Sequence, residues 1–122
     1  MGSESMSSII ARLALRTKLP SAARQVIPGM RALGRGSILF VNGSSAVEAR
    51  DAVTGTSIAF AGESAYAELL HGAVAPDIHV GQLIIPRGIG NGEESHAPET
   101  LADTLWRMHT EKGDFRVFAA EL

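Results

Sequence analysis

The sequence contains no cysteine, few aromatic side chains and no long apolar or basic run, and each absence excludes a class of protein. Without cysteine, the chain can form no disulfide, no thiolate nucleophile and no cysteine-bound zinc or iron–sulfur site. No apolar stretch approaches the roughly 18 residues that a membrane-spanning helix needs. The net charge is -2, and the basic residues do not gather into a run that could neutralise a row of phosphates. We therefore expect no membrane and no nucleic acid as partner, and a cytoplasmic location.

What the chain does contain is enough apolar material for one packed domain. It has 122 residues, of which 45% are hydrophobic and 20% charged. Residues 1–5 read like a remnant of cloning ahead of Met6. The segment 6–20 gives no clear pattern, so its structure is left open, and residues 21–122 are expected to form the domain.

Helical and strand patterns alternate along the domain. Helical spacing predicts helices at 21–33, with Ser21 as N-cap, at 56–74 and at 98–111; short apolar runs predict strands at 36–41, 79–86 and 115–119. We expect the second helix to be mostly buried, and the third to pack through Leu101, Leu105, Trp106 and Met108. Strands that alternate with helices form parallel sheets with right-handed crossovers. The predicted fold is thus a three-layer α/β domain with a small, partial Rossmann-like parallel sheet and helices on both faces.

The polar stretch 44–55 is expected to form a loop at the carboxyl end of the first strand, where α/β sheets bind ligands. Hydroxyl and carboxylate groups that converge above a sheet suit acid–base chemistry. The candidate catalytic residues are therefore Ser44, Ser45, Asp51 and Thr56, with Glu48 and Arg50 as charged neighbours. The alternative interpretation is a solvated loop without a function.

Other polar groups are better explained without a site. His96 stands among Glu93, Glu94 and Glu99, which could hold a metal, but a solvated loop leading into a helix explains the cluster, and no metal is predicted. The glycine cluster at 88–92 has the wrong spacing for a phosphate-binding turn. We interpret three further histidines as surface or interface residues: His71, His79 and His109.

Four local strings and the order of the elements resemble the second half of short-chain dehydrogenases/reductases. The strings are 26–31 (VIPGMR), 36–41 (GSILFV), 78–81 (IHVG) and 105–109 (LWRMH). In that family a serine and a tyrosine hold the substrate carbonyl, and a lysine lowers the pKa of the tyrosine. On this chain the three positions fall on Gly43, Thr56 and Phe60. The resemblance therefore implies the scaffold without the residues for hydride transfer.

The same resemblance predicts no bound dinucleotide. The family's pyrophosphate-binding turn belongs to a first strand and helix that have no counterpart here. The family's loop that touches the nicotinamide begins with Pro-Gly, whereas here Pro86 is followed by Arg87. The only tyrosine, Tyr66, lies ten residues past the family position and is interpreted as a core or interface residue. No cofactor is expected.

Two functions remain open at this point. The first is a catalytically degenerate relative of the short-chain dehydrogenases, a nonredox protein that binds or converts a small hydrophobic metabolite. An uncovered sheet edge and apolar helix faces are costly in water, so a homo-oligomer is expected. The resemblance implies that it associates through helices 21–33 and 56–74, because family members often pair through the corresponding helices. The alternative is an NAD(P)-dependent oxidoreductase completed by another chain, and only this alternative calls for NAD or NADP.

Overall fold

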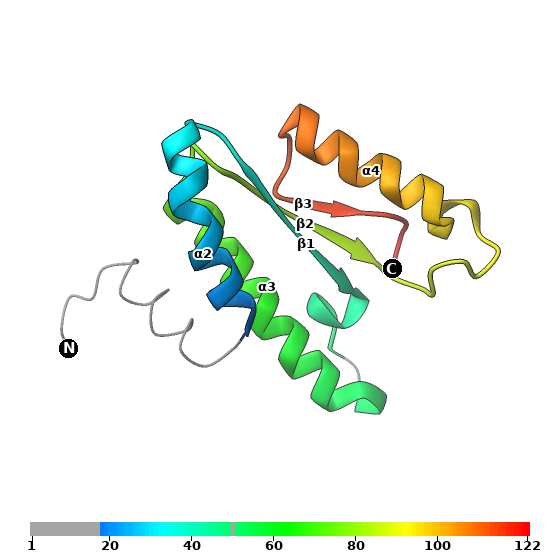
Figure 1. Cartoon of the computed structure of the whole chain (residues 1–122). Helices are drawn as coiled ribbons and strands as arrows, with labels where there is room; N and C mark the ends of the chain where they lie inside the picture. The colour runs from blue at the N-terminus through cyan, green and yellow to red at the C-terminus, as the bar shows by residue number, and fades with distance from the viewer. Residues whose placement is uncertain (1–17, 50) are drawn as a thin grey trace.

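The structure is a computed structural model, and it describes residues 18–49 and 51–122. Predictions for residues 1–17 lie outside the described residues. All six predicted helices and strands are confirmed, with bounds shifted by a few residues (Figure 1): α2 Lys18–Leu33, β1 Ser37–Gly43, α3 Thr54–Val74, β2 His79–Ile85, α4 Pro98–Glu111 and β3 Arg116–Phe118. Short 3-10 turns lie at η1 Ser44–Ala46, η2 Asp51–Val53 and η3 Glu94–His96. Ser21 is not the N-cap of α2, because the helix already begins at Lys18 and Pro20 suits a first turn.

The three strands form one parallel sheet in the order β1-β2-β3. Ser37 pairs with His79 at the start of the β1–β2 ladder, Gly43 pairs with Ile85 at its end, and Gln82 pairs with Arg116 in the β2–β3 ladder. The α2 and α3 helices lie on one face of the sheet and α4 on the other (Figure 1). The predicted three-layer α/β architecture is confirmed. The outer edge of β1 has no strand partner among the described residues.

Side chains of the strands alternate between the two faces, and each face has its own apolar core. The core under α2 and α3 contains Ala23, Phe40, Tyr66, Ala67, Leu70, Val74, Ile78 and Val80. The core under α4 contains Leu83, Ile85, Leu101 and Met108. Burial of one such large apolar side chain contributes about 1.5–3 kcal/mol. Tyr66 meets Phe40 edge to face at 6.1 Å, which confirms its interpretation as a core residue.

The expectation that α3 is mostly buried is wrong. Only one side of the helix contacts the sheet, and this side contains Ser57, Ser64, Tyr66, Ala67, Leu70 and Val74. The other side faces outward, and Ile58 is 70% exposed. Figure 1 shows the first turns of α3 extending past the sheet. Apolar residues occur around the whole helix, so the sequence does not show which side faces the sheet. The burial of two serines, Ser57 and Ser64, was therefore not predicted.

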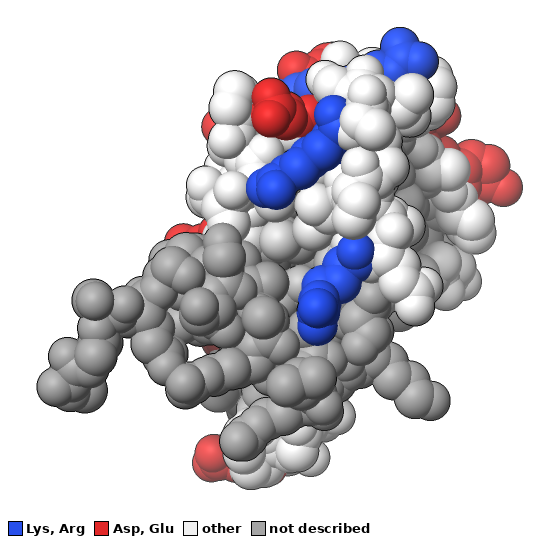
Figure 2. Space-filling view, turned by 60° about the vertical axis from the view of Figure 1, so that its left-hand side comes forward, with Lys and Arg blue, Asp and Glu red and all other residues white. Residues whose placement is uncertain are grey.

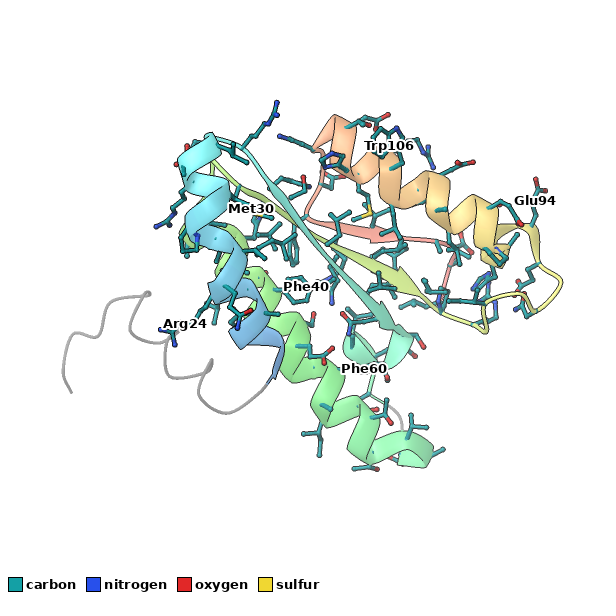
Figure 3. All side chains as sticks on the ribbon, viewed as in Figure 1. Arg24, Met30, Phe40, Phe60, Glu94 and Trp106 are labelled. Carbon is teal, nitrogen blue, oxygen red and sulfur yellow. The ribbon has the colours of Figure 1, made fainter. Side chains whose placement is uncertain are left out.

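The α4 helix packs as predicted except at one residue. Leu101 and Met108 are buried and Leu105 packs against them, which the spacing of 3.6 residues per turn explains. Trp106 was expected on the same side, but it is 65% exposed and lies on the outer side of α4 (Figure 3). No helix in the described part of the chain is long and apolar enough to cross a membrane.

Candidate functional site

A chain of hydrogen-bonded polar side chains crosses all three strands beneath α3. Arg116 on β3 donates from Nε to Gln82 Oε1 at 2.8 Å and from Nη2 to Ser64 Oγ at 2.9 Å. Gln82 on β2 donates from Nε2 to Asn42 Oδ1 at 3.0 Å. Asn42 on β1 donates from Nδ2 to Glu63 Oε2 at 2.7 Å. Asn42 and Gln82 are buried, at 4% and 0% exposure.

The chemistry of its two ends fixes the direction of this chain. An arginine can only donate hydrogen bonds, so the side-chain oxygen of Gln82 must face Arg116. The amide nitrogen of Gln82 then faces Asn42, whose own amide nitrogen is left to face Glu63. Glu63 must accept, as a carboxylate does. The chain thus runs from a cation at β3 to an anion at α3, and every amide in it is satisfied.

The parallel register explains how these residues meet. Gln82 lies opposite Arg116 on one side and opposite Phe40 on the other, so all three side chains project from the same face. Asn42 follows two residues after Phe40 and therefore shares that face. The α3 helix then brings Glu63 and Ser64 down onto the strands, since Ser64 lies on its buried side.

An apolar cleft of about 250 Å³ lies beside this chain, along the open edge of β1. Ala22, Ala23 and Val26 of α2 line one wall, residues 38–41 of β1 line the other, and Glu63 of α3 contributes the only charged side chain among the described lining residues. Phe40 projects between the sheet and the two helices, whereas Arg24 extends from α2 away from the sheet (Figure 3). A fixed carboxylate at the wall of an apolar cleft suits the binding of a small organic molecule.

The candidate residues from the sequence occupy two different environments. Ser44 and Ser45 are buried in η1, directly after β1, whereas Asp51 and Thr56 are exposed around the start of α3. No hydrogen bond or ion pair joins these four side chains within the described residues. Arg50 lies outside the described residues and Glu48 is exposed. A joint catalytic role for the four candidates stays a prediction.

The positions that the family resemblance assigned to catalysis do come close together. A Cβ atom at Gly43 would lie 3.6 Å from Cε2 of Phe60, an ordinary contact. Thr56 lies one helical turn before Phe60 on α3 and is exposed. The end of β1 therefore lies next to the aromatic ring of Phe60. The family's serine and lysine positions hold Gly43 and Phe60 instead.

The interpretation of His96 as part of a solvated loop is wrong. Its side chain is fully buried, and Nε2 accepts a hydrogen bond from the backbone N–H of Arg87 at 3.1 Å. Because Nε2 accepts, Nδ1 carries the hydrogen that reaches Ser95 Oγ at 2.8 Å. Both ring nitrogens are therefore engaged in holding the loop. No group of three metal-ligating side chains occurs among the described residues.

The glycine loop between β2 and α4 closes on itself. The N–H of Gly90 donates to the carbonyl of His96 at 2.8 Å, and Arg87 forms an ion pair with Glu93 at 2.8 Å. Hydrogen bonds from Arg87 and Asn91 hold the pKa of Glu93 below its usual value. Gly90 and Gly92 have φ angles of 74° and 99°, which other residues rarely adopt. These contacts give the loop a structural role.

Two of the three histidines interpreted as surface or interface residues are half-buried within the described part of the chain. His71 donates from Nδ1 to the carbonyl of Val80 at 3.1 Å. His79 lies near it, with ring centroids 6.4 Å apart, and its Nε2 atom is buried without a hydrogen-bond partner. Burial lowers the pKa of His79, and the charges of His71, Lys112 and His109 lower it further. His109 is exposed, as expected for a surface histidine.

Sequence reasoning missed all five residues of the polar chain. One signal was available: Gln82 interrupts the apolar run of β2, and a polar residue in a buried strand is more informative than its apolar neighbours. Comparison with known proteins adds nothing to this site, because no family model, curated protein or solved structure matches the chain.

Proposed function

We propose that this chain is a nonredox protein that binds or converts a small hydrophobic molecule in the cleft between α2, β1 and α3. We further propose that it is a catalytically degenerate relative of the short-chain dehydrogenases that keeps their scaffold without hydride transfer. The observation that carries the proposal is Glu63, a carboxylate held at the wall of an apolar cleft by a directed chain of hydrogen bonds.

The energetic cost of the polar chain supports a functional role. Buried amides and charges stabilise a fold less than apolar side chains of similar size would. A sheet face that served only to stabilise the fold would therefore be apolar. Here Asn42, Gln82 and Ser64 are buried on the face of the sheet beneath α3, and together with Arg116 they hold one carboxylate in place. Such fixed polar groups are what orient a ligand in a largely apolar site.

The state of the single tyrosine argues against hydride chemistry. Burial raises the pKa of Tyr66 and the charge of Arg24 offsets this only in part, whereas a tyrosine that exchanges a proton with substrate needs a pKa below its usual value. Its hydroxyl is buried without a hydrogen-bond partner, within the core and not at the cleft. With Gly43 and Phe60 in the family's serine and lysine positions, a redox role has no proton donor among these residues.

We also propose that two copies of the chain associate through α2 and α3. Leu33 and Ile58 are 72% and 70% exposed on these helices, which is a large apolar exposure for a free surface. In the view of Figure 2, the basic side chains on the described surface are separated from one another, and most of the surface between them is uncharged.

The cleft can be tested by blocking it. Val26 lines the cleft and is 45% exposed, so Val26→Trp fills the cleft from its solvent side without disturbing the core. The matched control is Ile89→Trp, since Ile89 is 62% exposed in the glycine loop. In a ligand-observed NMR screen of small hydrophobic fragments, we expect binding to the natural chain and to Ile89→Trp and loss of binding to Val26→Trp.

Two results would contradict the proposal. One is fragment binding that Val26→Trp leaves unchanged, which would place the ligand elsewhere. The other is tight binding of NADPH to the chain alone, which would revive the oxidoreductase interpretation.

A further inference from the structure

The charge of Glu63 has no oppositely charged partner among residues 18–49 and 51–122. Its Oε2 atom accepts one hydrogen bond from Asn42, and no described lysine, arginine or histidine lies within 4.0 Å of its carboxylate. The cation that ends the polar chain, Arg116, is separated from Glu63 by two neutral amides. The carboxylate therefore faces the cleft, and within the described part of the chain most of its hydrogen-bonding capacity and its charge are uncompensated.

The rest of the cleft wall cannot compensate this charge either. The described lining residues other than Glu63 are apolar, from Ala22 and Val26 on α2 to Ile38 and Val41 on β1. A carboxylate beside apolar walls interacts more strongly with an opposite charge than one in open water does, because the local dielectric constant is lower. It also repels carboxylate and phosphate groups for the same reason.

From this charge pattern we infer that the cleft selects a small ligand with a protonated amine on an apolar body. The inference rests on the proposed function of the cleft and deepens it by naming the ligand class. The amine donates to Glu63, and the apolar body lies against Val26 and Phe40. A volume of about 250 Å³ is at the small end of ligand pockets, so a single ring or a short alkyl chain fits it.

Three probes of nearly equal shape test the charge alone: benzylamine, benzyl alcohol and benzoate. In titrations of the full chain followed by NMR, we expect benzylamine to bind at least about tenfold more tightly than benzyl alcohol, or about 1.4 kcal/mol. Benzoate is expected to show no binding. High salt should weaken the binding of benzylamine and leave that of benzyl alcohol unchanged.

A matched pair of variants assigns the preference to one carboxylate. Glu63→Gln keeps the shape and should abolish the tenfold preference for benzylamine, whereas Glu68→Gln, on the exposed side of the same helix, should leave it unchanged. The salt comparison on the natural chain decides the question even if Glu63→Gln does not fold.

The possible failures are distinguishable. Equal binding of benzylamine and benzyl alcohol, or a preference that survives in Glu63→Gln, overturns the inference about the ammonium group and leaves the cleft as a hydrophobic site. If neither these probes nor a wider set of hydrophobic fragments bind, the proposed function itself is overturned.

Discussion

Gln82 is the residue on which the buried polar chain depends. It accepts from Arg116 and Ser64 and donates to Asn42, and its side chain is fully buried. Without Gln82, Arg116 would keep only Ser64 as a partner in this network and Asn42 only Glu63, so the link across the sheet would be broken. The charge that ends the chain, on Arg116, also lies against the ring of Phe115, 5.4 Å from its centroid.

Replacing Gln82 with leucine should therefore be strongly destabilising although it adds an apolar side chain to a buried position. The change removes one hydrogen bond from each of Arg116, Asn42 and Ser64, and a buried group that loses its hydrogen bond costs about 1–3 kcal/mol, more if it is charged. We expect a loss of about 2–4 kcal/mol in the free energy of unfolding, measured by urea denaturation. Gln25→Leu, at an exposed position of α2, is the control. If the Gln82→Leu variant were as stable as the natural protein, the row of hydrogen-bonded polar side chains would be dispensable for folding.

His79 gives the fold a dependence on acid. Its pKa in the folded chain is lowered from 6.5, chiefly by burial. The unfolded chain then binds the proton more readily than the folded chain, so protonation favours unfolding. The contribution of neutral His79 to stability is fully present above pH 6.5, and it is lost as the pH falls from 6.5 through the lower pKa of His79 in the folded chain.

The test compares unfolding free energies above and below pH 6.5 in the natural chain and in His79→Leu. We expect the variant to lose less stability on acidification, because it has no proton to bind at this position. The same change at the exposed His109, His109→Leu, should leave the acid dependence close to that of the natural chain. An equal acid loss in the natural chain and His79→Leu would assign the effect to other groups.

At the scale of elements, α3 decides both the core and the site. The hydrophobic pattern located this helix along the chain, but apolar residues around its circumference left its orientation undetermined. Two adjacent leucines show the difference: Leu70 is 1% exposed and belongs to the core, whereas Leu69 is only half-buried.

This orientation predicts unequal effects of the same substitution. Leu70→Ala should cost about 2–5 kcal/mol of unfolding free energy, as deletions in a closed core do. Leu69→Ala should cost less than half as much, because much of its side chain remains in water. Urea denaturation of the two variants measures both values. Equal costs would mean that α3 is rotated from the orientation described here.

The sequence predicted the elements, their parallel order and the three layers, because apolar runs and helical spacing are local signals. It predicted less of the site, because the polar chain joins Asn42, Glu63, Gln82 and Arg116 only through the register of the strands. No local pattern contains that register. His96 was misjudged for a related reason: its partners are backbone groups of Arg87 and Gly90, which the composition of the loop does not reveal.

For the whole molecule, the open edge of β1 and the outward faces of α2 and α3 predict self-association. A stable two-fold dimer buries about 1,200–2,000 Å² in total, and both helices carry strongly exposed apolar side chains, Leu33 on α2 and Ile58 on α3. We expect a dimer in sedimentation velocity and a monomer for Ile58→Glu, with unchanged circular dichroism. The control is Ile89→Glu, exposed in the glycine loop. A natural chain that sediments as a monomer at high concentration would contradict the dimer.

We propose that the protein binds its ligand in the cleft beside Glu63 and not at the carboxyl ends of the strands. A two-dimensional ¹H–¹⁵N NMR titration of the full chain tests it most directly, with benzylamine and NADPH as separate ligands. We expect benzylamine to shift the backbone signals of Val26, Phe40 and Glu63, and NADPH to shift the signals of none of the described residues. Shifts caused by NADPH in Ser44, Ser45 and the glycine loop would contradict it and indicate a nucleotide site at the carboxyl ends of the strands.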